Sequence, residues 1–331
     1  MLSEKEIVAK IFSIKTEEEF NHTAISVFNY QYEYNDIYKQ YVDLLGIKPN
    51  DIRHYLQIPF LPIEFFKSQQ VICQSTKKAD IVFSSSGTTG QITSKHFVND
   101  IELYKTSYSK GFEQFYGNID DYCILALLPN YLEREGSSLV YMFDDLIKQS
   151  KHVLSNFYLH NVDDLIKTIK ELKQQNQKTI LLGVTYALLD LAEKNIELNE
   201  NFIVMETGGM KGKRKELLKE ELHQLLKQSF KVNSIHSEYG MTELLSQAYS
   251  KENGLFNCPP WMRVLIRDIN DPFNYLSEKK NGGINVIDLA NLNSCSFIET
   301  KDLGKKHNSN TFEIIGRFDN SDLRGCNLII Q

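Results

Sequence analysis

The sequence has no long hydrophobic run. Nowhere in its 331 residues do about 18 apolar residues follow one another, which is the length that a membrane-spanning helix needs. The amino terminus is charged, with Glu4, Lys5 and Glu6, and leads into no apolar segment, so no secretory signal is visible. Internal repeats and low-complexity tracts are also absent. These absences predict a soluble protein of the cytoplasm, with no membrane span.

Cysteine is scarce and scattered. The five cysteines are Cys73, Cys123, Cys258, Cys295 and Cys326. Their number is odd, and their positions show no paired zinc spacing. They suit a reducing compartment better than a disulfide framework, and most free cysteines are small buried hydrophobic residues.

Positive charge is not concentrated anywhere. The chain has 37 lysines and arginines against 43 acidic residues, which gives a formal net charge of −6, and the basic residues are spread along it. This distribution argues against a nucleic-acid-binding surface. The lysine-rich stretch 211–215 is followed at once by acidic residues and is typical of a solvated helix start.

The hydrophobic pattern predicts an α/β protein. Residues 3–46 have helical spacing and close at Gly46, and residues 58–67 form a very apolar, proline-fixed segment that either crosses the core or shapes a substrate channel. The expected strands are 123–128, 152–158, 179–184, 202–205 and 231–235. The expected helices between them are 138–150, 162–175, 187–195 and 213–228, the last with an apolar stripe of Leu217, Leu218, Leu222, Leu225 and Leu226. Alternation of this kind implies a doubly wound, mostly parallel sheet.

The residue pattern changes at about residue 254, where the spacing typical of helices gives way to a pattern typical of short strands and turns. We therefore expect three regions. Residues 1–253 form the helical amino-terminal region and the α/β core, residues 254–315 form a smaller β-rich lobe of the same domain, and residues 316–331 form a tail. Doubly wound sheets bind ligands at the carboxyl ends of their strands. Residues 84–90, 206–209 and 237–243 all follow expected strands, so they should converge on one edge.

Residues 84–90 read Ser-Ser-Ser-Gly-Thr-Thr-Gly and follow the short apolar run 81–83. Small residues let backbone N–H groups approach an anion, and the hydroxyl groups add donors, so the stretch fits a loop that holds phosphates. It is not the common P-loop, which needs Gly-Lys-Ser/Thr after four residues. The same composition is also typical of an ordinary turn.

Three more motifs follow this loop in a fixed order. They are 239–243 (Tyr-Gly-Met-Thr-Glu), 300–302 (Thr-Lys-Asp) and 316–325, which begins with Gly-Arg. Singly, Asp302 beside Gly304 suits a turn, and Tyr239-Gly240 suits a strand corner. Together, over residues 80–325, the four motifs resemble the adenylate-forming superfamily that includes the acyl-CoA synthetases.

Longer runs resemble one branch of that superfamily. The runs at 58–67, 128–142 and 206–212 are similar to those of LuxE-type acyl-protein synthetases, which activate fatty acids for bacterial fatty-acid reductase complexes. Phenylacetate-CoA ligases are the next nearest group. The resemblance implies a nucleotide- and acyl-binding core, ATP and Mg²⁺ as cofactors, and a carboxylic acid, expected to be a fatty acid, as substrate.

The resemblance also implies roles for individual residues. The β- and γ-phosphates of ATP would be held by the loop residues Ser85, Ser86, Gly87, Thr88, Thr89 and Gly90. Thr242 would contact the α-phosphate, and Glu243 would hold Mg²⁺, a hard cation that takes oxygen ligands. Tyr239 would stack on adenine beside Gly208 and Gly209. Asp302 would accept hydrogen bonds from the ribose hydroxyls, and Arg317 would donate to them.

The chain departs from the superfamily pattern in three places. Lys301 replaces the glycine of the ribose motif, and the lysine that usually follows the phosphate loop is displaced to Lys95. Gln331 comes about where acyl-CoA synthetases begin a carboxyl-terminal domain with a catalytic lysine, so we expect the chain to lack that domain and residues 316–331 to be a hinge-like remnant. In the luminescence enzymes a cysteine close to the carboxyl terminus accepts the acyl group as a thioester, and Cys326 is so placed. The alternative is that Cys326 is a small buried residue.

The sequence thus predicts an ATP- and Mg²⁺-dependent ligase that makes an acyl-adenylate and passes the acyl group to a protein thiol. Its catalytic residues would be Thr242, Glu243 and Cys326, and an acyl reductase or acyltransferase would be the partner protein. Two alternatives stay open. One is a ligase that delivers to coenzyme A or to a carrier protein, and the other is a non-catalytic nucleotide-binding subunit of a biosynthetic complex.

Overall fold

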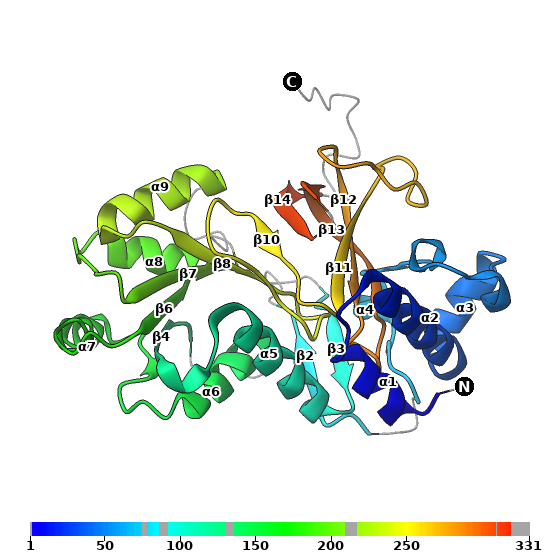
Figure 1. The fold of residues 1–331 in the computed structure, drawn as a ribbon, viewed down its shortest axis with the longest axis horizontal. Helices are drawn as coiled ribbons and strands as arrows, with labels where there is room; N and C mark the ends of the chain where they lie inside the picture. Colours follow the sequence, from blue (N-terminus) through cyan, green and yellow to red (C-terminus); the bar gives the residue numbers. More distant parts are fainter. Residues whose placement is uncertain are drawn as a thin grey trace.

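The computed structural model describes residues 2–74, 78–85, 92–129, 136–208, 217–308 and 310–318. Figure 1 shows their arrangement, with the α-helices of residues 4–68 beside one half of a long sheet and the later α-helices around the other half. Among the helices of these residues, none combines the length and the apolar character that a membrane crossing requires.

Within the described residues, 12 strands join in one sheet, in which eleven strands follow the order β11-β12-β13-β14-β10-β9-β8-β7-β6-β4-β5 and β1 pairs with β13. Its first strands are β1 (Leu61–Pro62), β4 (Cys123–Leu127), β5 (Asn156–Phe157), β6 (Thr179–Val184), β7 (Phe202–Thr207) and β8 (Ile235–Tyr239). The later strands are β9 (Ala248–Ser250), β10 (Phe256–Asn257), β11 (Met262–Arg267), β12 (Asn281–Asp288), β13 (Phe297–Lys306) and β14 (Thr311–Arg317). The sheet is therefore continuous across the border expected near residue 254.

The half from β5 to β8 is parallel and doubly wound, as the sequence predicts. Its helices are α5 (Ile101–Tyr116), α6 (Ser138–Ser150), α7 (Val162–Gln174), α8 (Thr185–Ala192) and α9 (Lys219–Phe230). In Figure 1, α5 and α6 lie on one face and α8 and α9 on the other. Strands β4 and β6 are buried along their whole length, which explains their unbroken apolar sequences.

Several expectations for this half are wrong in detail. The strand expected at 231–235 is β8 and begins only at Ile235, because Lys231 ends α9 in the left-handed conformation with φ of 57°. The strand expected at 152–158 is reduced to the two residues of β5. The leucine stripe expected along a helix at 213–228 is not one buried face: α9 begins only at Lys219, after Leu217 and Leu218, and within it Leu222 and Leu226 are buried but Leu225 is exposed.

The half from β9 to β14 pairs antiparallel, as expected for a β-rich region. The amino-terminal helices α1 (Glu4–Ile11), α2 (Glu17–Tyr34) and α3 (Asp36–Leu44) lie beside it (Figure 1). Ser3 with Glu6 and Thr16 with Glu19 form capping boxes that start the first two helices. Tyr38 stacks on Phe297 of β13, so this helical region is part of the same core.

The apolar segment 58–67 crosses that core. Two short helical elements precede it, η1 (Pro49–Asp51) and η2 (Tyr55–Gln57), and its last three residues begin the short helix α4 (Phe65–Ser68). Ile58, Phe60 and Leu61 are buried, and the Tyr38 hydroxyl donates a hydrogen bond to the Pro59 carbonyl at 2.7 Å. The core-crossing reading of this segment is therefore confirmed.

The phosphate-loop candidate does not follow a strand of the main sheet. Residues 81–84 form β2 (Ile81–Ser84), which pairs antiparallel with β3 (Lys95–Val98) in a separate two-stranded sheet. A further short element, η3 (Ile119–Asp121), follows α5. Strands β2 and β3 therefore contact the main sheet edge through the side chains of their buried face and are not members of that sheet.

Candidate functional site

The carboxyl ends of β7 and β8 carry two of the predicted site segments. Parallel pairing sets Glu206 beside Ser237 and Thr207 beside Glu238. Gly208 follows β7 with a φ of +67°, a backbone conformation that residues with a side chain rarely adopt, and its carbonyl accepts a hydrogen bond from the Thr185 hydroxyl at 3.0 Å. Gly209 lies outside the described residues.

Three other predicted residues come together from distant parts of the chain. The Tyr239 hydroxyl donates to Asp302 Oδ2 at 2.8 Å, and Arg317 Nε lies 3.7 Å from Asp302 Oδ1. Asp302 and Arg317 are register partners on β13 and β14. Burial raises the pKa of Asp302, while the Tyr239 hydrogen bond and the Arg317 charge act to lower it. Arg317 is 68% exposed, so its guanidinium is open to an incoming group.

Tyr239 is buried among aromatic rings. Its ring meets Phe256 and Phe312 edge to face, with centroids 6.0 and 5.8 Å away, and only 7% of the residue is exposed. The phenol is thereby fixed as the donor to Asp302. The predicted stacking of Tyr239 on adenine stays a prediction.

The turn that contains Thr242 and Glu243 is held by buried side chains from two other segments. Asn291 Nδ2 donates to the Glu243 carbonyl at 2.8 Å, and His96 Nδ1 lies 2.9 Å from the Thr242 carbonyl. The Asp288 carboxylate accepts from the backbone N–H groups of Leu245 and Ser246 at 2.8 and 2.9 Å. The backbone of this turn is therefore set by the protein itself.

His96 links the hairpin to this turn. Its Nε2 lies 3.0 Å from Asn291 Oδ1. Burial lowers the pKa of His96 to about 4, so the ring is neutral at physiological pH and donates its single N–H either to the Thr242 carbonyl or to Asn291. His96 thus ties β3 to the segment that carries Thr242.

Ser94 connects the start of the phosphate-loop candidate to Glu243. Ser85 donates its backbone N–H to the Ser94 carbonyl at 3.1 Å, and Ser94 donates its own to Ser85 Oγ at 3.0 Å. The Ser94 hydroxyl is hydrogen-bonded to the Glu243 carboxylate, which is 5% exposed. Burial raises the pKa of Glu243 and the Ser94 hydrogen bond counters this. Loop residues Ser86, Gly87, Thr88, Thr89 and Gly90 lie outside the described residues.

Lys95 is placed apart from this arrangement. Side chains alternate along a strand, so Lys95 lies on the face of β3 opposite Ser94 and His96. There it lines an open surface groove of about 450 Å³ with Lys67, Ile92 and Phe97. Its position does not favour a role as the lysine of the phosphate loop.

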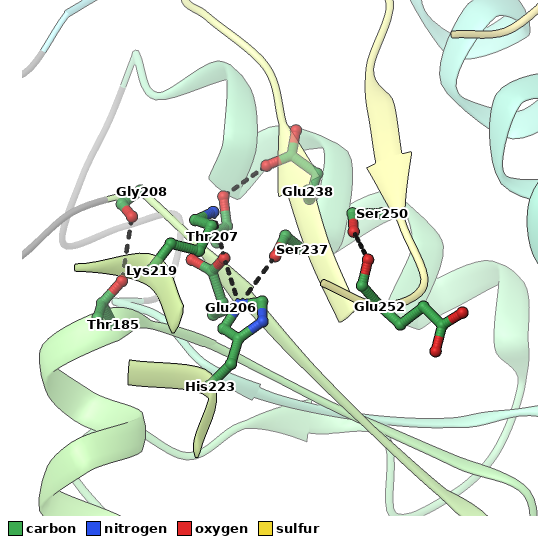
Figure 2. A network of polar contacts seen from close by, with 10 residues as sticks. All are labelled: Thr185, Glu206, Thr207, Gly208, Lys219, His223, Ser237, Glu238, Ser250 and Glu252. Atoms are coloured by element: carbon green, nitrogen blue, oxygen red, sulfur yellow. Dashed lines mark hydrogen bonds and ion pairs between the residues drawn. The ribbon is translucent and has the colours of Figure 1, made fainter. Parts of the chain in front are cut away.

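A buried ionic network occupies the α9 face of the same sheet edge (Figure 2). Lys219 Nζ lies 2.6 Å from Glu206 Oε1, and His223 Nε2 lies 3.4 Å from the same oxygen and 3.3 Å from Ser237 Oγ. Burial acts to raise the pKa of Glu206, but the Lys219 charge, with hydrogen bonds from His223, Lys219 and Ser237, outweighs it and lowers that pKa to about 2. This network fixes α9 to the ends of β7 and β8.

The opposite face of this edge carries Glu238 instead. Thr207 Oγ1 lies 2.5 Å from Glu238 Oε2 (Figure 2). Burial raises the pKa of Glu238 to about 7, and the negative charge of Glu206 adds to this effect. Glu238 therefore changes its protonation state near neutral pH.

Ser94, His96, Asp288 and Asn291 were not singled out from the sequence, and Glu206 and Glu238 appear there only as members of the segments 206–209 and 237–243, with no role of their own. A carboxylate two residues before a glycine, at Glu206 and at Glu238, was the available signal. Cys326 lies outside the described residues. The described cysteines are all free; Cys73, Cys123 and Cys295 are buried and Cys258 is half-buried. Among the described residues, no group of three or more histidine, cysteine or acidic side chains could hold a metal ion.

Comparison with known proteins gives consistent results. The family model described as acyl-protein synthetase, LuxE, matches residues 10–331. A long-chain-fatty-acid–luciferin-component ligase of Vibrio harveyi is 21% identical over 322 residues, which cover 91% of this chain and 84% of that protein.

Solved structures share the fold. An open conformation of 2-hydroxyisobutyryl-CoA ligase with 2-HIB-AMP and CoA superposes with a TM-score of 0.68 at 11% identity, covering 93% of this chain and 72% of that one. ATP-bound MatB from Rhodopseudomonas palustris gives a TM-score of 0.53 at 16% identity, covering 72% of this chain and 48% of that one. The chain thus spans about half the length of MatB. These likenesses confirm the predicted fold of adenylate-forming ligases.

Proposed function

Because this chain belongs to the LuxE family of acyl-protein synthetases, we propose that it activates a fatty acid with ATP as an acyl-adenylate and transfers the acyl group to a protein thiol. The Vibrio harveyi relative, a long-chain-fatty-acid ligase by name, supports a fatty acid as the substrate. The substrate class, the cofactors and the roles of single residues are part of this proposal.

One observation carries the proposal. Asp302 lies between Tyr239 and Arg317, which come from separate motifs, at 2.8 and 3.7 Å. A half-buried carboxylate beside an exposed guanidinium suits a pair of ribose hydroxyls, because the carboxylate accepts hydrogen bonds and the guanidinium donates them. We assign Asp302 and Arg317 to the ribose of ATP, and Tyr239, Gly208 and Gly209 to its adenine.

The phosphates are assigned to the neighbouring turn and hairpin. Thr242 would contact the α-phosphate, and the loop that begins at Ser85 would hold the β- and γ-phosphates. Ser94 and His96 join these two segments through the contacts given above. Reaction at the α-phosphate needs chiefly positioning and charge neutralisation, so a turn whose backbone is already held favours it.

Glu243 is the proposed Mg²⁺ ligand. Mg²⁺ in nucleotide sites is bound by one or two carboxylates together with substrate phosphates, and a single buried carboxylate held by the Ser94 hydroxyl fits this donor set. When bound, the ion would neutralise charge on the phosphates.

The chemistry follows from the weakness of a carboxylate as an electrophile. A carboxylate oxygen of the acid attacks the α-phosphorus of ATP, the bond to the bridging oxygen breaks, and pyrophosphate leaves. The resulting mixed anhydride has AMP as a good leaving group. A thiol then attacks its carbonyl carbon and forms a thioester.

Cys326 is the proposed acceptor thiol. Burial raises the pKa of the Cys258 and Cys295 thiols to about 12 and that of Cys123 to about 11, and it raises the pKa of Cys73 as well. The thiolate is the nucleophile, so these buried thiols are poor acceptors. An acyl reductase or acyltransferase would then take the acyl group from the protein.

The test is acid-dependent exchange of labelled pyrophosphate into ATP, measured over a series of fatty acids and one aromatic acid. We expect exchange with at least one fatty acid and a loss of about 100-fold in Asp302→Ala. Cys326→Ser should continue the exchange but lose stable self-acylation. Absence of exchange with every acid, with or without a partner reductase, contradicts the proposal, and persistent acylation of Cys326→Ser excludes Cys326 as acceptor.

A further inference from the structure

Glu238 has a carboxyl group aimed at the turn to which the nucleotide is assigned. It is the last residue but one of β8, and it is 6% exposed. Its Oε2 is hydrogen-bonded to Thr207, while Oε1 lies so close to Gly240 that a Cβ at that glycine would be 2.5 Å away. Gly240 opens the turn that leads to Thr242. The Oε1 atom of this carboxyl group therefore lies against the turn that carries Thr242.

We propose that Glu238 is the general base of the second half-reaction, taking the proton from the thiol that attacks the acyl-adenylate. The inference rests on the proposed function and adds a catalytic group to it. In the step, the S–H proton passes to a Glu238 oxygen and the sulfur forms a bond to the carbonyl carbon. The bond from that carbon to the phosphate oxygen breaks, and AMP leaves with the electron pair. The proton on Glu238 is then lost to solvent.

The other acidic groups of the site are committed elsewhere. Glu206 is held as a carboxylate by Lys219 at 2.6 Å, on the opposite face of the sheet. Asp302 is engaged by Tyr239 and Arg317, and Glu243 by Ser94. Both ring nitrogens of His96 face oxygen atoms of the protein. Compared with these acidic groups and His96, all within the described residues, Glu238 is left with an oxygen that faces the turn.

The surroundings of Glu238 give it a proton affinity suited to the task. Burial raises its pKa to about 7, the Thr207 hydrogen bond and the Lys219 charge act to lower it, and the Glu206 charge acts to raise it. A general base works best when its pKa lies near the working pH. The titratable groups of neighbouring elements that act on its charge are Glu206 and Lys219, from the opposite face of the sheet, and the tyrosines Tyr104, Tyr116 and Tyr249. The pKa of each of these tyrosines is raised by burial, so the tyrosines are neutral there.

The experiment measures both half-reactions on the same protein. Pyrophosphate exchange reports acyl-adenylate formation. Thioester formation is followed in a single turnover with labelled fatty acid, both on the protein and on added N-acetylcysteamine as a free thiol. We expect Glu238→Gln to lower the rate of thioester formation by about 100-fold, far more than it lowers exchange, because positioned bases contribute about that factor. Glu238→Asp should recover part of the loss.

A matched variant separates a chemical role from a structural one. Thr207→Val removes the hydrogen bond that lowers the pKa of Glu238, so that pKa rises. The base is active only when ionised, and the acid limb of the transfer rate should therefore move to higher pH in Thr207→Val and vanish in Glu238→Gln. A structural role would leave the position of that limb unchanged.

Two results would overturn the assignment. Equal losses of exchange and transfer in Glu238→Gln would make Glu238 a structural residue, and unchanged transfer with an unchanged pH profile would remove it from the mechanism. If the unmodified protein itself shows no exchange with any acid, the proposed function fails first, and this inference fails with it.

Discussion

Glu206 and Glu238 stand at the ends of neighbouring parallel strands, and both are almost fully buried. On the α9 face, Glu206 has a lysine, a histidine and a serine within hydrogen-bonding or ion-pairing range (Figure 2). On the other face, Glu238 has a single threonine hydroxyl. Burial is nearly the same in the two cases, so the partners decide that one carboxylate stays ionised and the other titrates near pH 7.

The two glutamates of this sheet edge are therefore suited to different roles, one to holding the fold and the other to chemistry. A carboxylate that never protonates near neutral pH can hold α9 in place, because its charge is constant. A carboxyl group with a pKa near the working pH can exchange a proton with a substrate. In the register of β7 and β8, Glu206 pairs with Ser237, the residue before Glu238. The side chains of Glu206 and Glu238 therefore lie close in register but on opposite faces of the sheet.

Removing Lys219, the cation beside Glu206, should have the largest effect on this sheet edge. Lys219→Met leaves Glu206 buried without its cation, which should lower the free energy of unfolding by about 3 to 5 kcal/mol at neutral pH. Urea unfolding measures this. The double variant Lys219→Met, Glu206→Gln removes the stranded charge and should recover most of the loss; a single variant as stable as the parent would contradict the assigned role of the pair.

The pH dependence of stability should distinguish the two residues, because ionised Glu206 stabilises the fold and ionised Glu238 destabilises it. The pKa of Glu206 is lowered from 4.5 to about 2 in the folded protein, so its stabilisation is complete above pH 4.5 and is lost as pH falls toward 2. The pKa of Glu238 is raised from 4.5 to about 7, so its ionisation destabilises the fold increasingly from pH 4.5 to pH 7.

Glu238→Gln should therefore be more stable than the parent above pH 7, by about 3 kcal/mol at 1.36 kcal/mol per pKa unit, and no different below about pH 4.5. Glu206→Gln should be less stable than the parent at pH 7, with the deficit closing below pH 4.5. Denaturant titrations at several pH values test both. A deficit in Glu238→Gln that is the same at every pH would mean that packing, and not ionisation, dominates at that position.

Two neighbours on β3 give the smallest expected effect and its control. His96→Ala leaves the Thr242 carbonyl or Asn291 without its partner, which should cost about 1 to 3 kcal/mol of stability and slow pyrophosphate exchange. Lys95→Ala, on the exposed face, should stay within about 0.5 kcal/mol. Similar losses of exchange in both variants would show that β3 matters as a strand and not through His96.

Much of the fold follows from periodicity. Residues 138–150 and 179–184 form α6 and β6 with the expected bounds, because their apolar spacing matches the faces they bury. The strand that became β8 was expected to end at residue 235, because Ser237 and Glu238 are polar. The hydrophobic pattern does not show that these two polar side chains are buried with partners inside the protein. The loop at 84–90 was expected to follow a strand of the main sheet, and only the pairing of β2 with β3 shows that the strand before it belongs to a separate two-stranded sheet.

The site could be predicted where residue type is itself the signal. Tyr239, Asp302 and Arg317 were named from their motifs, and the structure brings them together. Ser94, His96, Asp288 and Asn291 could not be named, because they act by hydrogen bonds to one another and to the backbone of a turn distant in sequence. Such contacts leave no spacing pattern in the chain.

Trapping the acyl-adenylate tests most directly whether this sheet edge forms it, as we propose. The protein would be incubated with fatty acid, Mg²⁺ and ATP labelled at the α-phosphate, and the quenched products separated. We expect labelled acyl-AMP that appears only with the acid present and is strongly reduced in Asp302→Ala. Labelled ADP as the acid-dependent product, or ATP bound with no acyl-AMP from any acid, would contradict it.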